Sequence, residues 1–330
     1  MSLRYAVFGH PVAHSRSPQI HAAFAAKAGI DLVYERIDAA PGDFARAVED
    51  FARAGGRGAN VTLPHKPAAL ALCDAVAPRA VRAGAVNTLI RLGDAPDGRA
   101  RWQGDNTDGI GLVRDLRDRH GLVLEGAHVL LLGAGGAGAG VAPALLEAGI
   151  ARLWVANRGI ARAQALVARL DDARAAALAL PTAEAAACSD DVATPGLRTL
   201  GDGDACPEHG TGLPDAGTAP RGGAVPSLAT LAGARVDLVI NATSAARGGA
   251  APWQALHALM PRVAAAVDLG YREAARPFLE FAREGGAARR IDGLGMLVEQ
   301  AAESFRLWHG LMPAVSPVLA RLRAELGDPP

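Results

Sequence analysis

The sequence predicts an α/β protein with two domains, each built on a parallel or mostly parallel sheet that helices cover. Length and composition give the first reason, because 330 residues are long for one hydrophobic core and half of them are apolar. The second reason is that short apolar runs alternate with helical patterns from the N-terminus onward, as in βαβ units. The third is an unbroken apolar run at residues 128–132, typical of a strand buried on both faces.

Charge and cysteine content narrow the classes of function. The 34 Lys and Arg residues balance 34 Asp and Glu residues, so no overall field attracts nucleic acid or a membrane surface. Cys73, Cys188 and Cys206 are widely spaced and include no C-x-x-C pair, which argues against a disulfide framework or a structural zinc site. The N-terminus leads straight into a strand-like run and offers no signal peptide. We therefore expect a soluble cytoplasmic protein without a metal.

In the first third of the chain, predicted strands and helices alternate. The strands are residues 5–9, 32–37, 59–63, 85–92 and 101–104. The helices are residues 18–28, which Gly29 ends, residues 43–54, and an alanine-rich helix from Pro67. These elements predict a mostly parallel sheet.

The second domain is predicted to begin with a helix from Asn106, where Ile110, Val113 and Leu116 recur at three-residue spacing. Its predicted strands are residues 128–132, 152–156, 236–240 and 263–269, and a helix after the first strand ends at Gly149. This pattern is that of a Rossmann-type nucleotide-binding sheet. The nearly uncharged residues 129–150 are rich in glycine and so fit a strand, turn and helix better than a bilayer span. A strongly periodic helix at residues 293–310 comes last.

The composition changes between Ala173 and Pro226. The segment is first rich in alanine and then dense in Gly, Pro, Asp and Thr. Few large apolar residues are present to offset the entropy of ordering the chain. We expect residues 188–224 to form a mobile surface insertion without chemistry.

A glycine-rich stretch, Gly133-Ala134-Gly135-Gly136-Ala137-Gly138, lies between the predicted 128–132 strand and a helix. In that context G-x-G-x-x-G is a dinucleotide fingerprint. The first glycine makes the turn, the second admits the pyrophosphate, and the third lets helix and strand pack closely. The helix N-terminus supplies a partial positive charge. The alternative is a glycine-rich packing turn.

The end of the next strand indicates which dinucleotide binds. An NAD site needs Asp or Glu there to bind the ribose 2′-OH, but this strand leads into Asn157 and Arg158, with Arg162 one helical turn later. Two guanidinium groups without a carboxylate favour a 2′-phosphate, and hence NADP(H). The alternative is that both arginines are ordinary helix-surface residues.

Lys66 stands just past the end of the predicted 59–63 strand. Ligands of open α/β sheets bind beyond the carboxyl ends of the strands, where an ammonium can act on a substrate oxygen as acid, electrophile or base. A carboxylate such as Asp108 would orient that ammonium. Taken alone, Lys66 also fits a solvated loop, and Asp108 also fits a helix cap.

Short polar side chains follow other strands. Ser15 and Ser17 flank a predicted helix start, with Ser17 as the N-cap and Pro18 as the first helical residue, and such a site binds anions like a carboxylate. Asn87 and Thr88, with the run 106–108, can bind the hydroxyl groups of a ligand. Each alone also fits an ordinary turn.

Together these motifs resemble the shikimate dehydrogenase family. They occur in order over nearly the whole chain apart from the insertion: residues 9–18 (GHPVAHSRSP), 60–66 (NVTLPHK), 84–88 (GAVNT), 104–109 (GDNTDG), 133–138 (GAGGAG), 241–244 (NATS) and 292–297 (DGLGML).

The resemblance implies reversible NADPH-dependent reduction of 3-dehydroshikimate to shikimate, in aromatic amino-acid and chorismate biosynthesis. It implies that Lys66 and Asp108 form the catalytic pair, and that Ser15 and Ser17 hold the substrate carboxylate. The ring hydroxyls would contact Thr62, Asn87, Asp108, Tyr271 and Gln300. The cofactor would contact Gly133, Ala134, Gly135, Gly136, Ala137, Asn157, Arg158, Arg162, Leu269 and Gly293.

The family's architecture implies an active site in a cleft between two domains. The substrate domain would be discontinuous, residues 1–107 plus 294–330, and the Rossmann-type NADP-binding domain would be residues 108–293. The expected assembly is a monomer or a homodimer. Three features depart from the family pattern: Gly159 replaces a usual threonine beside the 2′-phosphate site, the segment 268–271 is less bulky, and the insertion after Leu170 is long.

Three alternatives remain at this point. A quinate/shikimate dehydrogenase would use the same residues with broader choice of substrate and cofactor. A methylene-tetrahydrofolate dehydrogenase would share two domains and a lysine, but would not need the serines at 15 and 17. A dinucleotide-binding regulator would need neither Lys66 nor Asp108.

Overall fold

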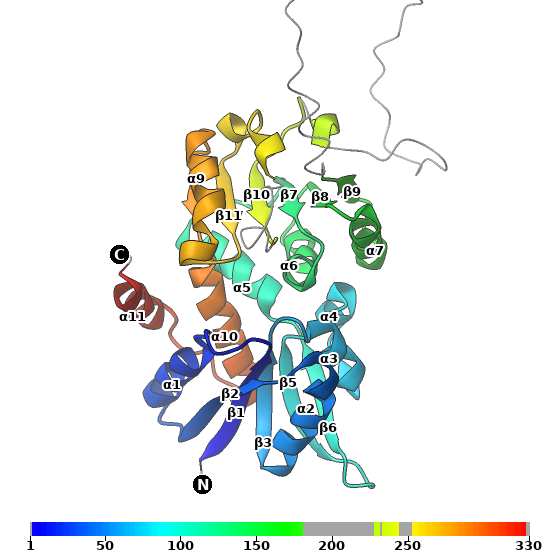
Figure 1. Ribbon diagram of the computed structural model, residues 1–330. Helices are drawn as coiled ribbons and strands as arrows, with labels where there is room; N and C mark the ends of the chain where they lie inside the picture. Colours follow the sequence, from blue (N-terminus) through cyan, green and yellow to red (C-terminus); the bar gives the residue numbers. More distant parts are fainter. Residues whose placement is uncertain (1, 181–227, 232, 244–252, 328–330) are drawn as a thin grey trace, which may run out of the picture.

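The computed structural model describes residues 2–180, 228–231, 233–243 and 253–327, and it contains two α/β units that pack against each other (Figure 1). Each unit has a six-stranded sheet. The strand order is β2-β1-β3-β5-β6-β4 in the first unit and β12-β11-β10-β7-β8-β9 in the second. The predicted fold class is confirmed, with a refinement to the first sheet.

The first sheet is mixed. Among its described strands, β1 runs parallel to β2 and β3, and β4 to β6, whereas β5 is antiparallel to both β3 and β6. The antiparallel pair β5–β6 arises because only residues 95–99 connect the two strands, too few for a parallel crossover. The strands are β1 (Leu3–Gly9), β2 (Leu32–Asp38), β3 (Gly56–Val61), β4 (Ala75–Val76), β5 (Thr88–Asp94) and β6 (Ala100–Asp105).

Four α-helices connect these strands: α1 (Ser17–Ala28), α2 (Phe44–Arg53), α3 (Lys66–Leu72) and α4 (Pro78–Ala83). The apolar stripe of α2 packs on the sheet, where Phe44 and Phe51 both make edge contacts with Phe8. Gly29 ends α1 in the left-handed conformation that glycine favours, as predicted.

Two strand boundaries differ from the prediction. The pattern extends a strand to Leu63, but β3 ends at Val61, and Leu63 lies on the surface with 57% of its area exposed. The pattern also begins a strand at residue 85, whereas β5 begins at Thr88. Residues 86 and 87 instead bond to neighbouring segments, because the Val86 N–H donates to the Lys66 carbonyl and the Asn87 N–H to the Asp105 carbonyl. Both differences leave a polar residue just outside a strand: Thr62 after β3 and Asn87 before β5.

All described strand pairs of the second sheet are parallel. Its strands are β7 (His128–Leu132), β8 (Arg152–Asn157), β9 (Ala175–Ala179), β10 (Leu238–Asn241), β11 (Ala265–Asp268) and β12 (Arg290–Ile291). Its main helices are α6 (Gly136–Glu147), α7 (Ile160–Leu170) and α9 (Arg276–Glu284). The short helices among the described residues are η1 (Pro41–Asp43), η2 (Asp115–Arg119), η3 (Leu228–Leu231), η5 (Gln254–Leu256), η6 (Met260–Arg262) and η7 (Arg272–Ala274).

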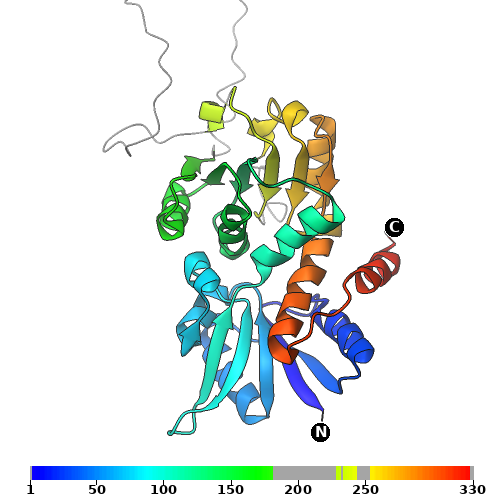
Figure 2. The ribbon, with the colours of Figure 1, turned by 180° about the vertical axis from the view of Figure 1, so that it is seen from behind.

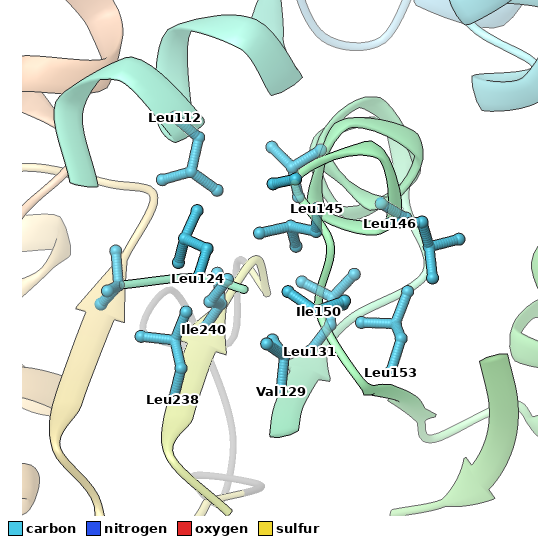
Figure 3. Packing of buried hydrophobic residues seen from close by; sticks show 14 of the residues in the cluster. Leu112, Leu124, Val129, Leu131, Leu145, Leu146, Ile150, Leu153, Leu238 and Ile240 are labelled. Carbon is cyan, nitrogen blue, oxygen red and sulfur yellow. The ribbon is translucent and has the colours of Figure 1, made fainter. Parts of the chain in front are cut away.

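Strand β7 is buried on both faces, as its unbroken apolar run predicts. Val129 and Leu131 point into one core with Leu145 of α6 and Leu112 (Figure 3). Leu130 and its neighbour two residues on point into the core on the other face of the sheet. The uncharged run at 129–150 therefore forms a buried strand, a turn and a helix. No helix in the described ranges is long and apolar enough to cross a membrane.

Strand β9 was not predicted. The sequence pattern predicts no element for residues 175–179, but these residues pair with β8 at the edge of the sheet. Alanine has low strand propensity, so the sequence carries little signal here, and pairing with β8 outweighs propensity. The predicted insertion at 188–224 lies outside the described residues.

Two helices pass between the units. Helix α5 (Asp108–Arg114), continued by η2, leads from the first sheet to the second, and α10 (Leu294–His309) returns to the first (Figure 2). Helix α11 (Ser316–Leu326) then lies beside α1. The predicted apolar face of α10 is buried, since Leu294, Val298 and Phe305 pack in a core shared with α1 and α11.

Glu303, on α10, is surrounded by arginines and has only 1% of its side chain exposed. Its carboxylate lies 2.8 Å from Arg306, 3.0 Å from Arg114 and 3.3 Å from Arg79. Burial raises the pKa of Glu303, but the hydrogen bonds and charges of Arg306 and Arg114 outweigh burial and lower this pKa to about 2.

We predict that Glu303→Gln lowers the free energy of unfolding by roughly 3 kcal/mol at pH 7, because three arginines lose their shared counterion. Because the pKa of Glu303 is lower in the folded state than in the unfolded chain, its ionised carboxylate stabilises the folded state at pH values above the unfolded pKa. This stabilisation is lost as the pH falls toward 2. Urea unfolding at pH 7 and at pH 3 should therefore show a smaller difference between variant and wild type at pH 3. An equal difference at both pH values would contradict this account.

Candidate active site

A cavity of about 230 Å³ lies between the two units, beyond the carboxyl ends of β1 and β3. The first sheet, its helices, the loop after β11, and helices α5, α6 and α10 all contribute to its wall. The lining residues are Val7, His14, Ser15, Arg16, Ser17, Asn60, Val61, Thr62, Lys66, Asn87, Asp108, Ala137, Leu269, Tyr271, Gly293, Met296, Leu297 and Gln300.

Lys66 and Asp108 form an ion pair in this cavity, with Nζ 2.5 Å from Oδ2. Lys66 is the first residue of α3 and Asp108 the first of α5, and the structure brings together the two side chains that the sequence analysis pairs. Their side chains are 12% and 7% exposed. A lysine has three N–H donors, and Asp108 is the one hydrogen-bond partner of this ammonium among the described residues. The others can reach a ligand in the cavity.

Asn87 fixes the carboxylate. Its Nδ2 donates to Asp108 Oδ1 at 2.7 Å, while its Oδ1 accepts from the Thr107 N–H at 2.9 Å and from the Thr88 hydroxyl at 2.8 Å. These contacts determine which way the amide points. Both oxygens of Asp108 therefore have a donor from the first unit.

A second buried amide, Asn60, was not among the predicted site residues. Its Oδ1 accepts from the Tyr34 hydroxyl at 2.7 Å, and its Nδ2 donates to Ser304 Oγ at 3.0 Å. The Ser17 hydroxyl also hydrogen-bonds Tyr34. A polar residue at the end of a central buried strand was the available signal. Hydrogen bonds thus connect Ser17, through Tyr34 and Asn60, to the residues around Asp108.

His21 contacts two members of this network, Tyr34 and Asn60. It is fully buried, stacks on Tyr34 at 4.5 Å between ring centres, and lies with Nε2 3.1 Å from Asn60 Oδ1. Burial lowers the pKa of His21 to about 3, so its ring is neutral at ordinary pH. Since Asn60 Oδ1 can only accept, Nε2 carries the hydrogen.

The two serines lie together, with Ser15 Oγ 3.2 Å from Ser17 Oγ. The predicted N-cap role of Ser17 is wrong, because α1 begins at Ser17 and Arg16 occupies the cap position. The Ser17 N–H donates to Ser15 Oγ at 3.3 Å, so Ser15 is the residue whose hydroxyl bonds to the helix start. Ser15 and Ser17 both line the cavity.

The glycine turn between β7 and α6 has the close approaches that the fingerprint predicts. Gly133 adopts φ 101°, which favours glycine, and a Cβ on Gly138 would lie 2.0 Å from the Gly133 carbonyl oxygen. A Cβ on Gly135 would meet no atom within 4 Å, so its outer face is open. The turn can therefore admit a pyrophosphate against its backbone.

The end of β8 lies beside that turn. Asn157 Oδ1 accepts from the Ala134 N–H at 3.2 Å, and its Nδ2 donates to the Gly159 carbonyl at 2.9 Å. Arg158 and Arg162 are exposed, and neither forms an ion pair with a described residue. Both guanidinium groups are available to an anion at this position.

Of the predicted cofactor residues, Ala137, Leu269 and Gly293 line the cavity. The remaining ones lie on the glycine turn and at the end of β8, outside the cavity lining. Gly293 is confined, since a Cβ there would lie 2.3 Å from the Leu269 carbonyl oxygen. The described residues include no group of three His, Cys, Asp or Glu side chains that could hold a metal ion.

Asp268, at the end of β11, shapes the loop that carries Leu269 and Tyr271. It accepts from Asn241 Nδ2 at 2.6 Å and from the Gly270 N–H at 2.7 Å. Burial raises the pKa of Asp268 to about 6. Sequence reasoning singled out this segment but not the carboxylate that holds it.

Three family models match parts of the chain in order. The shikimate dehydrogenase substrate binding domain matches residues 7–89, shikimate / quinate 5-dehydrogenase matches residues 116–194, and the shikimate 5′-dehydrogenase C-terminal domain matches residues 293–323.

Several proteins are similar over almost the whole chain. The shikimate dehydrogenase (NADP(+)) of Xanthomonas oryzae pv. oryzae is 48% identical over 323 residues, 98% of this chain and 96% of that protein. The enzyme of the same name from Xanthomonas campestris pv. campestris is 50% identical over the same shares. The crystal structure of shikimate 5-dehydrogenase from Thermus thermophilus in complex with NADP(H) and shikimate is 35% identical, with a TM-score of 0.69, over 98% of this chain and 99% of that chain.

We predict that His21→Phe makes protein stability less sensitive to mild acid. The folded pKa of His21 lies below the unfolded value near 6.5, so the wild type loses stability as pH falls from about 6.5 toward 3 while the unfolded chain takes up a proton. Between pH 7 and pH 5 this histidine alone removes at most roughly 2 kcal/mol. At pH 7 the variant should be less stable by about 1 kcal/mol, for the lost bond to Asn60.

Urea unfolding at pH 7 and pH 5 measures both effects. The variant should lose less stability than the wild type between these pH values. Equal losses would mean that the pKa of His21 is not lowered in the folded protein.

Proposed function

The chain belongs to the shikimate dehydrogenase family, and from this premise we propose which of its residues carry the reaction. It is an NADP-dependent shikimate dehydrogenase, an oxidoreductase of the shikimate pathway. The reaction is the reversible reduction of the 3-dehydroshikimate ketone to the alcohol of shikimate, with hydride supplied by NADPH. What remains to be proposed is the role of each residue.

We propose that Lys66 is the acid of the reduction. Hydride addition leaves negative charge on the carbonyl oxygen, and an ammonium beside that oxygen stabilises the charge and donates its proton. The observation that carries this proposal is the 2.5 Å Lys66–Asp108 contact in the wall of the cavity. Asp108 orients the ammonium, and Asn87 holds Asp108 through the bond to Oδ1.

The same cavity also contains the residues that we propose to bind the substrate. Ser15 and Ser17 would hold the carboxylate with two hydroxyl donors, since their oxygens lie 3.2 Å apart at one wall. Thr62, Asn87, Asp108, Tyr271 and Gln300 line the cavity and would contact the ring hydroxyls. A volume of about 230 Å³ suits one small polar ring acid.

The residues around the glycine turn fit an NADP(H) cofactor, which supplies the hydride when bound. The backbone from Gly133 to Ala137 would hold the pyrophosphate at the start of α6. Asn157, Arg158 and Arg162 would hold the adenosine ribose and its 2′-phosphate. Leu269 and Gly293, which line the cavity, would lie near the nicotinamide.

A quinate/shikimate dehydrogenase is the second candidate, because the family model over residues 116–194 names both substrates. Oxidation of quinate compared with shikimate at equal enzyme would distinguish the two. The intact Lys66–Asp108 pair argues against the hypothesis of a dinucleotide-binding regulator. The match to shikimate dehydrogenases over almost the whole chain argues against a methylene-tetrahydrofolate dehydrogenase.

We propose the domain limits that the sequence predicts: a substrate domain of residues 1–107 plus 294–330 and a cofactor domain of residues 108–293. Their support is that α5 begins at Asp108 and α10 at Leu294, the helices on which the chain passes between the sheets. We propose a monomer or homodimer in the cytoplasm; three widely spaced cysteines without a C-x-x-C pair support a reducing compartment.

We predict that Lys66→Ala lowers kcat for NADPH oxidation with 3-dehydroshikimate by roughly two to four orders of magnitude, because the alkoxide loses its proton donor. The chain contains one other lysine, Lys27, at the end of α1, so Lys27→Ala is a matched control that should keep the wild-type kcat. A Lys66→Ala variant with near wild-type kcat would remove Lys66 from the mechanism.

We predict that the double variant Arg158→Ala and Arg162→Ala loses selectivity for NADPH over NADH, since both proposed partners of the 2′-phosphate are removed. Its kcat/KM for NADPH should fall at least roughly tenfold, while kcat/KM for NADH changes little. Parallel loss with both cofactors would mean that the arginines do not recognise the 2′-phosphate. The exposed Arg46→Ala on α2, far from the turn, is a control for loss of surface charge.

A further inference from the structure

Helix α6 contains a glycine that the dinucleotide fingerprint does not require. The third fingerprint glycine is Gly138, which allows the close approach to the turn. Gly140 lies beyond it, buried inside α6. Helices disfavour interior glycine relative to alanine, and α6 uses alanine at four other positions, 137, 139, 142 and 144. Another constraint therefore keeps position 140 without a side chain.

The atoms nearest to Gly140 identify that constraint. A Cβ on Gly140 would lie 2.7 Å from Asp108 Oδ2, the oxygen that accepts from Lys66. It would also lie 3.2 Å from Asn106 Oδ1. The first distance is too short for a carbon and an oxygen in van der Waals contact, so a methyl group at 140 would displace either the carboxylate or the helix.

Asp108 has little freedom to move away. Asn87 holds Oδ1 at 2.7 Å, and Lys66 holds Oδ2 at 2.5 Å. The Asp108 N–H donates to Asn106 Oδ1 at 3.1 Å, and Asn106 in turn donates to the Ala85 carbonyl at 2.9 Å. Moving the carboxylate would break at least one of these bonds.

The backbones of α5 and α6 also approach closely here. A Cβ on Gly109, next to Asp108, would lie 2.6 Å from Ala144 Cβ and 2.8 Å from the Gly140 carbonyl oxygen. At the start of α6, a Cβ on Gly136 would lie 3.7 Å from Lys66 Cδ. Helix α6 thus contacts both members of the pair, four residues apart.

We propose that Gly140 is a positioning residue for the Lys66–Asp108 pair, an inference that rests on the proposed catalytic role of Asp108. Because Gly140 has no side chain, α6 packs directly on the carboxylate. The same rigid helix begins at the glycine turn that is proposed to hold the cofactor. Helix α6 therefore sets the distance between the proton donor and the hydride donor.

The test is Gly140→Ala. We expect kcat with 3-dehydroshikimate and NADPH to fall by roughly tenfold to a hundredfold, since small displacements of catalytic groups have effects of this size. The Kd for NADPH, measured by calorimetric titration, should not change, because the turn itself is intact. Gly42→Ala is the matched control, because a methyl group there meets no atom within 4 Å.

The Asp108→Ala background separates this role from a general effect on α6. Without the carboxylate, the 2.7 Å contact is gone. The contacts that remain, 3.2 Å to the Cβ of residue 108 and 3.2 Å to Asn106 Oδ1, need a shift of only a few tenths of an ångström, so Gly140→Ala should cause no further loss of kcat. If Gly140→Ala alone does not fold, the double variant should fold.

Three results would overturn the role of Gly140: a wild-type kcat in Gly140→Ala, a Kd for NADPH that rises as much as kcat falls, or a double variant that loses further activity or does not fold. A different result bears on the proposed function itself. If Asp108→Ala alone keeps the wild-type kcat, Asp108 is not catalytic, and the inference fails with it.

Discussion

The site depends on one ion pair, between the Lys66 ammonium and the Asp108 carboxylate. Both groups stand at helix starts, on α3 and α5, so neither is fixed by the regular bonding of a strand. Asn87 orients the carboxylate through Oδ1, and α6 packs against Oδ2. The lysine is notable because the chain has two lysines among its 34 basic residues. Arginine cannot give up its proton in proteins, so a chain that otherwise uses arginine needs a lysine where a proton is to move.

Around this pair, buried charges and buried amides serve different purposes. The cluster of Glu303 with Arg79, Arg114 and Arg306 joins α10 to α4 and α5, and therefore fixes helices rather than ligands. The network of Asn60, Tyr34 and His21 is uncharged at neutral pH, so it adds no charge to a cavity wall that already contains Lys66, Asp108 and Arg16. Neutral hydrogen bonds can connect the serine pair to the Lys66–Asp108 pair without adding a further charge to the cavity wall.

The fold class could be predicted, and many residues that line the cavity could be named, because both leave local signals: an unbroken apolar run for β7, a glycine turn before α6, and polar residues after strand ends. The errors have physical causes. Leu63 is apolar, but Pro64 follows it, and the strand ends before both. The alanine-rich residues 175–179 form β9 because β8 offers bonding partners, which no local pattern reveals. Asn60, His21 and Gly140 matter through contacts with residues far away in the sequence, so their roles become visible only in three dimensions.

The central claim is that Lys66 donates a proton and does not merely supply positive charge. Chemical rescue of the Lys66→Ala variant tests it directly, with NADPH oxidation by 3-dehydroshikimate as the readout. Ethylamine, which carries an ammonium with protons at neutral pH, should restore a saturable part of the lost rate. Tetramethylammonium, which has the charge but no proton, should restore none. Equal rescue by both cations, or rescue by neither, would contradict the account.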